Sequence, residues 1–359
     1  MKIKALCLAA AAALSLATGA VAQTNWPIKE GDYVAKNFKF GTGETLPELR
    51  LHYTTLGEPK RDAKGKITNA VMVLHGTGGT GKQFLSPQFA EELYKPGGVL
   101  DPAKYYIIMP DSIGHGKSSK PSDGLKARFP QYDYDDMVVA QHELLTKGLG
   151  VDHLRLLFGT SMGCMHGFVW AEQYPTFSQA MMPMACLPTE IAGRNRLWRK
   201  MTIDGITSDP AWNGGDYTSQ PQQGLRIATN FLILAGSSTI PMQKALPTRE
   251  AVDKFVEADV ARRMAGIDAN DFLYQVSSSR NYNPWPKLDA VKVPMTWINS
   301  ADDFINPPEL GIDLEAAKRL PTAKYILIPA SENTKGHGSH TWAVLWQDEM
   351  KALLERTEK

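Results

Sequence analysis

Short apolar runs recur along the chain and set its expected architecture. They cover residues 70–74 (AVMVL), 105–109 (YYIIM), 154–158 (LRLLF), 180–184 (AMMPM), 295–298 (MTWI) and 325–328 (YILI). Runs of this length and composition are typical of strands buried on both faces. The first two are each followed by a Gly-rich turn and helix-compatible sequence, an alternation that indicates βαβ units. The pattern therefore predicts an α/β fold, with a mostly parallel sheet and helices on both of its faces.

Two other patterns lie at the ends of this series. After a polar lead-in, residues 38–40 and 49–56 have the composition of two antiparallel strands, joined by a turn that contains Gly and Pro. At the other end, residues 342–355 have the apolar period of an amphipathic helix. We therefore expect a strand pair before the parallel strands and a helix after them.

One long segment interrupts the alternation. Residues 187–288 contain no clear buried strand but several helix-like stretches, including 221–234 and 249–264. This indicates a mainly helical cap inserted between two sheet strands, so that residues 23–186 and 289–359 together form the core. A cap at this position covers the carboxyl ends of the strands, where open α/β sheets bind their ligands.

The first residues predict export. Two lysines precede the apolar stretch 5–16, and residues 20–22 (AVA) form an A-x-A cleavage site, so residues 1–22 are expected to be a secretory signal peptide. The apolar stretch is shorter than the roughly 20 residues that cross a bilayer. The mature protein should begin at Gln23 and be periplasmic or secreted.

Charge and cysteine content narrow the possible partners. The formal net charge of +1 gives no electrostatic reason to expect nucleic acid or a membrane surface as partner, so we expect a small molecule. Beyond residue 22 the cysteines are Cys164 and Cys186. They are either two small core residues or one disulfide that the export compartment permits. Their spacing does not match a zinc site.

The strongest chemical signal is G-T-S-M-G at residues 159–163, between the run ending at residue 158 and the helix-like residues 164–174. G-x-S-x-G between a strand and a helix is the nucleophile elbow of serine hydrolases. The turn must be tight to expose the Ser161 hydroxyl, and Gly159 and Gly163 have no Cβ to collide across it. The following helix points its free N–H groups at a developing oxyanion. Ser161 is therefore the candidate nucleophile.

A Gly-rich turn at residues 75–82 (HGTGGTGK) follows the first buried run and fits three motifs. A dinucleotide site would need an acidic residue about 20 positions later, and none is well placed. A P-loop needs Ser or Thr after its lysine, where this chain has Gln83. The remaining motif is the H-G turn of a serine hydrolase. It predicts an oxyanion hole from the backbone N–H groups of Thr77 and Met162, and no cofactor.

A serine nucleophile needs a base and an orienting acid, which on this fold follow in the order Ser, Asp or Glu, His. Just past a late strand stand Asp302 and Asp303, and past the last strand stand His337 and His340. Each loop thus offers two candidates. The H-x-x-H spacing lacks an evident third ligand for a metal site. His115, in an earlier Gly-rich turn, is expected to shape the pocket wall.

Taken together, the motifs resemble those of the homoserine O-acetyltransferase branch of the α/β-hydrolases. The resemblance is carried, in chain order, by residues 136–141, 159–163, 209–212, Gly215, Tyr217, Pro221, Gly224, Leu225, 268–270 and 307–309. It implies the α/β-hydrolase fold. Alignment on the paired prolines places the acid on Asp303, and alignment on the Gly-His pair places the base on His337.

The chain also departs from that branch. Where the branch carries arginines suited to a substrate carboxylate, this chain has Thr229 and residues 234–237 (LAGS), and its turn at 111–116 is closer to that of general esterases. Acetyl-CoA is a cytoplasmic metabolite, whereas residues 1–22 predict export. These departures favour water over an alcohol as the acyl acceptor.

The sequence therefore predicts an exported serine hydrolase that cleaves a small ester, thioester, lactone or amide through an acyl-enzyme on Ser161. His337 would move the proton and Asp303 would orient His337. The alternative at the same site is an O-acyltransferase. A second alternative is a binding protein that has the fold without the chemistry, which is disfavoured because every required residue type is present in order.

Overall fold

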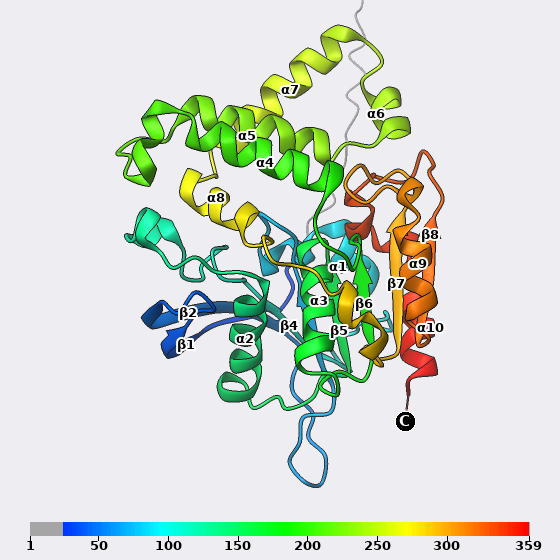
Figure 1. The fold of residues 1–359 in the computed structure, drawn as a ribbon. Coiled ribbons are helices and arrows are strands. Elements are labelled where there is room, and N and C mark those ends of the chain that lie inside the picture. The colour runs from blue at the N-terminus through cyan, green and yellow to red at the C-terminus, as the bar shows by residue number, and fades with distance from the viewer. Residues whose placement is uncertain (1–23, 359) are drawn as a thin grey trace, which may run out of the picture.

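The computed structural model describes residues 24–358, and the strands in this range form one eight-stranded sheet (Figure 1). The strand order is β1-β2-β4-β3-β5-β6-β7-β8; β1, β2 and β4 pair antiparallel, and the remaining neighbours pair parallel. The strands are β1 Lys29–Lys39, β2 Thr45–Leu56, β3 Ala70–Leu74, β4 Tyr106–Pro110, β5 Leu156–Thr160, β6 Met181–Met184, β7 Met295–Ser300 and β8 Ala323–Ile328. The expected signal peptide, residues 1–22, lies outside the described residues.

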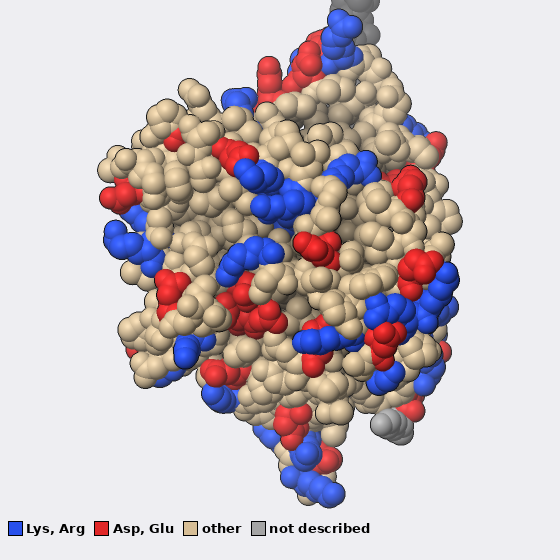
Figure 2. Space-filling model, viewed as in Figure 1, with Lys and Arg blue, Asp and Glu red and all other residues tan. Residues whose placement is uncertain are grey.

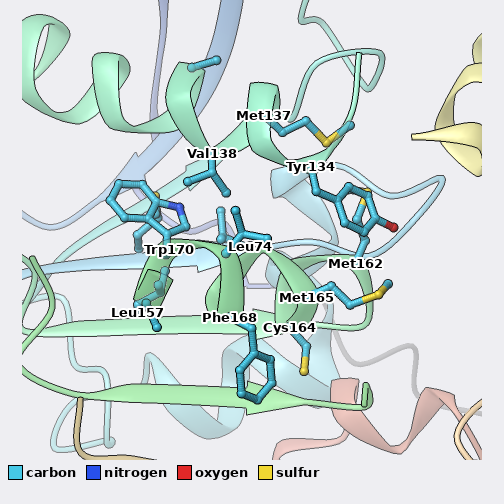
Figure 3. Packing of buried hydrophobic residues seen from close by; sticks show 14 of the residues in the cluster. Leu74, Tyr134, Met137, Val138, Leu157, Met162, Cys164, Met165, Phe168 and Trp170 are labelled. Atoms are coloured by element: carbon cyan, nitrogen blue, oxygen red, sulfur yellow. The ribbon is translucent and has the colours of Figure 1, made fainter. Parts of the chain in front are cut away.

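Helices cover both faces of the sheet. On one face lie α2 (Tyr134–Glu143), α3 (Met162–Gln173) and α9 (Ile312–Arg319), and on the other lie α1 (Pro87–Leu93) and α10 (Gln347–Arg356). Successive side chains of each buried strand enter opposite cores because a strand alternates its faces. In Figure 3, Trp170 and Phe168 of α3 and Val138 of α2 pack over Leu74 and Leu157 of the sheet. The expected α/β fold with a mostly parallel sheet is confirmed.

The first strand differs most from the sequence expectation. β1 begins at Lys29, within the segment expected to be a polar lead-in, and its side chains are mostly exposed or half-buried. It pairs only with β2 at the edge of the sheet. Because an edge strand with one solvated face does not need apolar residues at every position, no apolar run revealed it.

The expected closing helix is also shorter than its apolar period suggested. α10 begins at Gln347, whereas residues 338–341 and 343–345 form short 3-10 turns. Trp342 and Trp346 have non-helical backbone angles. The apolar period in this region therefore reflects burial against the sheet rather than one continuous helix.

The segment between β6 and β7 is helical and lies over the carboxyl ends of the parallel strands (Figure 1). It contains α4 Gly193–Thr207, α5 Gln222–Ala235, α6 Thr239–Ala245, α7 Arg249–Met264 and α8 Ala269–Ser277. Buried residues of α4, α5 and α8 form an apolar cluster separate from the two sheet cores. α8 also contacts the core, since Gln275 donates to the carbonyl of Gly114 at 2.7 Å and Tyr274 donates to the carbonyl of Phe129 at 2.7 Å.

On the face drawn in Figure 2, acidic and basic side chains are interspersed over most of the surface. Among the described residues many charged side chains form ion pairs, such as Lys117 with Glu30 at 2.6 Å and Lys324 with Glu349 at 2.6 Å. None of the helices in residues 24–358 combines the length and apolar character that crossing a bilayer requires.

Candidate active site

Ser161 lies at the tight turn between β5 and α3. Its backbone has φ 54° and ψ −110°, a conformation that costs a non-glycine residue about 1–3 kcal/mol. A Cβ on Gly159 would collide with the carbonyl of Gly163, and a Cβ on Gly163 would collide with the carbonyl of Leu74. The Ser161 N–H donates to the carbonyl of Met184 at 2.8 Å, which holds the turn against β6. The sequence thus builds the strained elbow that the G-x-S-x-G pattern predicted.

The three residues expected to act together are hydrogen-bonded in series. His337 Nε2 lies 2.8 Å from Ser161 Oγ, and His337 Nδ1 lies 2.8 Å from Asp303 Oδ2. Each residue comes from a loop at the carboxyl end of a parallel strand: β5 for Ser161, β7 for Asp303 and β8 for His337. These ends meet at one edge of the sheet, so residues 34 and 176 positions from His337 reach the same imidazole.

Asp303 is buried and fully hydrogen-bonded. Oδ1 accepts from the backbone N–H of Ile305 at 2.7 Å and of Asn306 at 3.2 Å, and Oδ2 also accepts from the Asn306 amide at 3.0 Å. Burial raises the pKa of Asp303, but the charge of His337 and these hydrogen bonds outweigh burial and lower that pKa below its usual value. Asp303 is therefore ionised and can hold the Nδ1 proton of His337.

The other candidate in each loop has a different environment. Asp302 accepts from the hydroxyls of Ser300 at 2.5 Å and Thr334 at 2.8 Å and from the Gly336 N–H at 3.1 Å, so it joins the β7 end to the loop that carries His337. His340 is buried with its ring 5.4 Å from that of His337. Burial lowers the pKa of His340 to about 3. Neither Asp302 nor His340 touches Ser161.

The turn after β3 passes directly beside the nucleophile. A Cβ on Gly76 would lie 3.2 Å from the Cβ of Ser161. The Ser112 N–H donates to His75 Nε2 at 3.0 Å, so the proton is on His75 Nδ1, which donates to the Gly76 carbonyl at 2.8 Å. This fixes the peptide plane between Gly76 and Thr77, whose N–H points away from that carbonyl. Met162 is the first residue of α3, so its N–H has no acceptor within the helix.

Ser161 and His337 line a pocket of about 810 Å³ between the sheet edge and the cap. The core contributes Thr77 and the cap contributes Arg199 from α4, a residue that no sequence pattern singled out. His115 is buried beside this pocket, not in contact with Ser161: its Nδ1 donates to the carbonyl of Ile113 at 2.8 Å and its ring lies 4.9 Å from that of His75. The cap thus supplies a wall of the pocket that contains the nucleophile.

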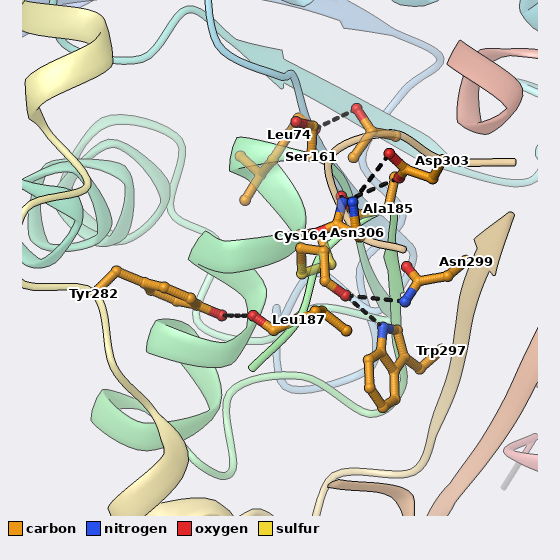
Figure 4. The surroundings of a disulfide bond; sticks show 12 residues. Leu74, Ser161, Cys164, Ala185, Leu187, Tyr282, Trp297, Asn299, Asp303 and Asn306 are labelled. Atoms are coloured by element: carbon orange, nitrogen blue, oxygen red, sulfur yellow. Dashed lines mark hydrogen bonds between the residues drawn. A yellow bond between two sulfur atoms is a disulfide. The ribbon is translucent and has the colours of Figure 1, made fainter. Parts of the chain in front are cut away.

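Cys164 and Cys186, which the sequence left open, form a disulfide (Figure 4). The bond joins the first turn of α3 to the chain just after β6. The Cys186 carbonyl accepts from Trp297 Nε1 at 3.1 Å and from the Asn299 amide at 3.2 Å. The disulfide therefore ties the nucleophile helix to β7, the strand that leads to Asp303.

A second connection in Figure 4 runs from β6 to the acid itself. The Asn306 amide donates to the carbonyl of Ala185 at 3.0 Å as well as to Asp303. Ala185 has a positive φ of 63°, an uncommon conformation for a residue with a Cβ. Asn306 and the disulfide thus hold the acid loop and the nucleophile helix in register, and no sequence motif had singled out Asn306.

Comparison with known proteins agrees with this architecture. Residues 69–333 match the family model described as alpha/beta hydrolase fold, and the chain belongs to that family. The crystal structure of homoserine O-acetyltransferase from Bacillus anthracis superposes with a TM-score of 0.79, covering 92% of this chain and 98% of that chain at 20% sequence identity. That likeness shows the shared fold.

The relatives found by sequence include both acyltransferases and an ester hydrolase. The chain is 27% identical to a probable acyltransferase of Methanothermobacter thermautotrophicus, over 81% of this chain and 88% of that protein. It is 33% identical to a homoserine O-acetyltransferase of Thermobifida fusca over 51% and 50%, respectively. It is 32% identical to an ethyl acetate hydrolase of Pseudomonas veronii over 64% and 66%. The resemblance to the homoserine O-acetyltransferase branch is confirmed, and the chain is an enzyme of the esterase or acetyltransferase kind.

Proposed function

We propose that this chain is an exported serine hydrolase that cleaves a small ester, thioester, lactone or amide through an acyl-enzyme on Ser161. The observation that carries the proposal is the series of two 2.8 Å hydrogen bonds from Ser161 through His337 to Asp303. The strained elbow beneath Ser161 and the nearby turn at Gly76 support the same chemistry.

In this mechanism His337 Nε2 takes the hydroxyl proton as Ser161 Oγ bonds to the substrate carbonyl carbon. Asp303 keeps His337 in the productive tautomer and stabilises the imidazolium. The N–H groups of Thr77 and Met162 bind the oxyanion of the tetrahedral intermediate. His337 then gives its proton to the leaving group as the bond between that group and the carbonyl carbon breaks. Water, activated by the same imidazole, attacks the acyl-enzyme and releases the acid and free Ser161.

An O-acyltransferase is the second candidate, and the names of the relatives favour it. There an alcohol, not water, would attack the acyl-enzyme. Hydrolysis is preferred because Thr229 and residues 234–237 stand where the acetyltransferase branch carries arginines, and because the predicted signal peptide would remove the protein from cytoplasmic acetyl-CoA. The export part of the proposal is tested by sequencing the N-terminus of the native protein. It should start at or close to Gln23, and an intact Met1 on cytoplasmic protein would contradict it.

The reaction is tested with activated esters of increasing acyl chain length, each assayed with and without an alcohol acceptor, while the products are partitioned between free acid and new ester. We expect free acid to dominate, and acetyl-CoA with homoserine to give negligible O-acetylhomoserine. Faster turnover of that pair than of the simple esters would instead establish the acyltransferase.

The matched control is Ser161→Ala, which removes the nucleophile and leaves the fold intact. A fluorophosphonate should label the wild type and not this variant. Loss of the nucleophile in a comparable triad has cost about 10⁶ in kcat, so the residual activity of the variant should be at most about 10⁻⁴ of the wild type. Equal labelling of both proteins would contradict the assignment of Ser161 as the nucleophile. No ester turnover by the wild type would favour the binding-protein alternative.

A further inference from the structure

Arg199 is a charged residue inside the pocket without a charged partner. Its side chain is only 2% exposed and lines the same 810 Å³ pocket as Ser161 and His337. Nε donates to Asn195 Oδ1 at 3.0 Å, and Nη1 lies 3.4 Å from the carbonyl of Val276. Both acceptors are neutral. Within residues 24–358 no ion pair of Arg199 with a carboxylate is found.

Other charged groups on the pocket wall already have ion-pair or hydrogen-bond partners within the protein. Arg263 pairs with Asp259 at 2.7 Å. The carboxylate of Asp271 accepts from the N–H of Ser122 at 2.8 Å and from its hydroxyl at 2.6 Å. The other acidic residue of the pocket, Asp268, accepts from the Tyr217 hydroxyl and the Gln220 amide, each at 2.7 Å. Neither Asp268 nor Asp271 therefore balances the charge of Arg199.

Two buried hydroxyls add to this arrangement. The Tyr134 hydroxyl lies beside Arg199 and Thr77, and among the described residues neither that hydroxyl nor Thr77 Oγ1 has a hydrogen-bond partner of good geometry. Burial raises the pKa of Tyr134, with the charge of Arg199 acting in the opposite direction, so Tyr134 stays a neutral donor. A guanidinium and two buried hydroxyls thus come together from α4, α2 and the turn after β3. Arg199 and Thr77 line the pocket, and Tyr134 is buried next to them.

This set of donors has a definite chemical preference. Burying a guanidinium without an anion is costly, and neutral acceptors offset only part of that cost. A carboxylate is an acceptor with two oxygens that can bind a guanidinium through two parallel hydrogen bonds and still accept from hydroxyls. A neutral alkyl or acetyl ester offers no such group. Arg199 would then keep only its neutral contacts: Asn195 Oδ1, the Val276 carbonyl and the Trp198 ring, whose centroid lies 4.7 Å from the guanidinium carbon.

We propose that Arg199, with Tyr134 and Thr77, binds a carboxylate of the substrate, so that the preferred substrates of this site are esters that carry a free carboxylate. The inference rests on the hydrolase function proposed above and narrows its substrate class. Arg199 comes from α4, a different part of the cap from Thr229 and residues 234–237, so the absence of the branch's arginines at those positions does not exclude a substrate carboxylate.

Two matched pairs of esters test whether the carboxylate is recognised and on which side of the scissile bond. The acyl-side pair is the 4-nitrophenyl monoester of glutaric acid and its ω-carboxamide counterpart. The leaving-group pair is the acetyl ester of 4-hydroxybutyrate and that of 4-hydroxybutyramide. The quantity measured is the ratio of kcat/KM for the charged ester to that for its neutral partner. We expect this ratio to exceed 10 for one pair in the wild type, on the order of what one charge-assisted hydrogen bond contributes.

Arg199→Gln should lower this ratio by about 10- to 100-fold, and Arg199→Lys should lower it less because it keeps the charge without the paired donors. Arg196→Gln, an exposed arginine on the same helix, is the matched control and should leave the ratio unchanged. If Arg199→Gln does not fold, the wild type still gives an answer: glutarate should inhibit hydrolysis of a neutral ester far more strongly than glutaramide.

Two outcomes would overturn the inference: ratios near 1 for both pairs together with equal inhibition by glutarate and glutaramide, or an unchanged ratio in folded Arg199→Gln. Either result, obtained while neutral esters are still cleaved in a Ser161-dependent way, leaves the hydrolase proposal standing. Failure of the wild type to cleave any of the four esters or the simple ester panel would instead contradict the hydrolase itself.

Discussion

The carboxyl ends of the parallel strands, here called the sheet edge, and the cap above them contribute to the same pocket in different ways. At the sheet edge, Ser161, Asp303 and His337 sit on short loops directly after buried strands, and hydrogen bonds to neighbouring backbone fix each loop. In the cap, α4, α5 and α8 pack on one another around their own apolar cluster. The cap meets the core through polar contacts, such as Gln275 of α8 with the Gly114 carbonyl, and through Phe304 and Ile305 of the loop after β7, which pack against the cap cluster.

This difference suggests a division of roles: the strand ends hold the reacting groups, and the cap selects the substrate. A reacting group must be held to within a fraction of an ångström, and strand ends in a parallel sheet supply that rigidity. A substrate-selecting wall tolerates more variation, which suits helices inserted between two strands. We therefore expect substitutions at the sheet edge to change the rate of the chemical step, and substitutions in the cap to change selectivity or stability.

The largest effect is expected from His337→Ala at the sheet edge, because it removes the proton acceptor of Ser161. Loss of the triad histidine in a comparable enzyme has cost about 10⁶ in kcat, so we expect a loss of at least about 10⁴ here, with an unchanged melting temperature. His340→Ala is the neighbouring control and should lose less than about 30-fold, since its ring touches His337 but not Ser161. Steady-state kinetics on an activated ester measures both. Equal losses would show that the hydrogen-bond geometry does not identify the base.

Asp303→Asn should have the next largest effect. An asparagine cannot stabilise the imidazolium and favours the wrong tautomer of His337, a change that has cost about 10⁴ in a comparable triad. We expect at least about 10³ in kcat. Asp302→Asn should cost less than about 30-fold, because its amide oxygen can still accept from Gly336 or Thr334. A larger loss for Asp302→Asn would transfer the orienting role to Asp302.

The disulfide should affect stability more than rate. It closes a loop of sequence separation 22, for which chain entropy predicts about 3 kcal/mol of stabilisation. Urea unfolding of the oxidised protein and of the protein reduced with dithiothreitol should differ by roughly this amount. The double variant Cys164→Ser with Cys186→Ser should be as unstable as the reduced protein and insensitive to reductant. Two titratable thiols in unreduced native protein would contradict the bond.

The smallest effect, on the pH dependence of stability, should come from Asp271, where the cap contacts the core. Burial raises the pKa of Asp271 from 3.8 to about 6, although its bonds to Ser122 oppose the shift. Between about pH 4 and 6 the folded protein therefore binds more protons than the unfolded chain, so its free energy of unfolding falls as pH rises through this window.

Asp271→Asn should remove this dependence. The difference in unfolding free energy, wild type minus variant, should decrease by on the order of 2 kcal/mol from pH 4 to pH 7. Urea unfolding at the two pH values measures it, and Asp253→Asn on the exposed side of α7 is the control that should show no such change. A difference that stays constant across the window would mean that Asp271 ionises as readily in the folded state as in the unfolded chain.

The sequence by itself determined the elements that local constraints define, such as a strand buried along its whole length or a turn that only certain residues can form. A central strand is covered on both faces, so most of its positions are apolar, and residues 70–74 and 295–298 were visible for that reason. The elbow was visible because its strain is local and only glycines fit around Ser161. The edge strand β1 was missed because a half-solvated strand does not need an apolar run.

Where the sequence offered two neighbouring candidates for one role, tertiary structure alone decided which of them contacts the other catalytic residues. Two neighbouring carboxylates are equivalent in a sequence, and only the path of the loop after β7 directs Asp303 to His337 and Asp302 to the Gly336 N–H. Likewise, the pairing of the two cysteines and the entry of Arg199 into the pocket depend on segments far apart in the chain. Contacts of this kind arise from packing between elements and leave no period in the sequence, which is why the local pattern indicated the chemistry and only the fold brought its parts together.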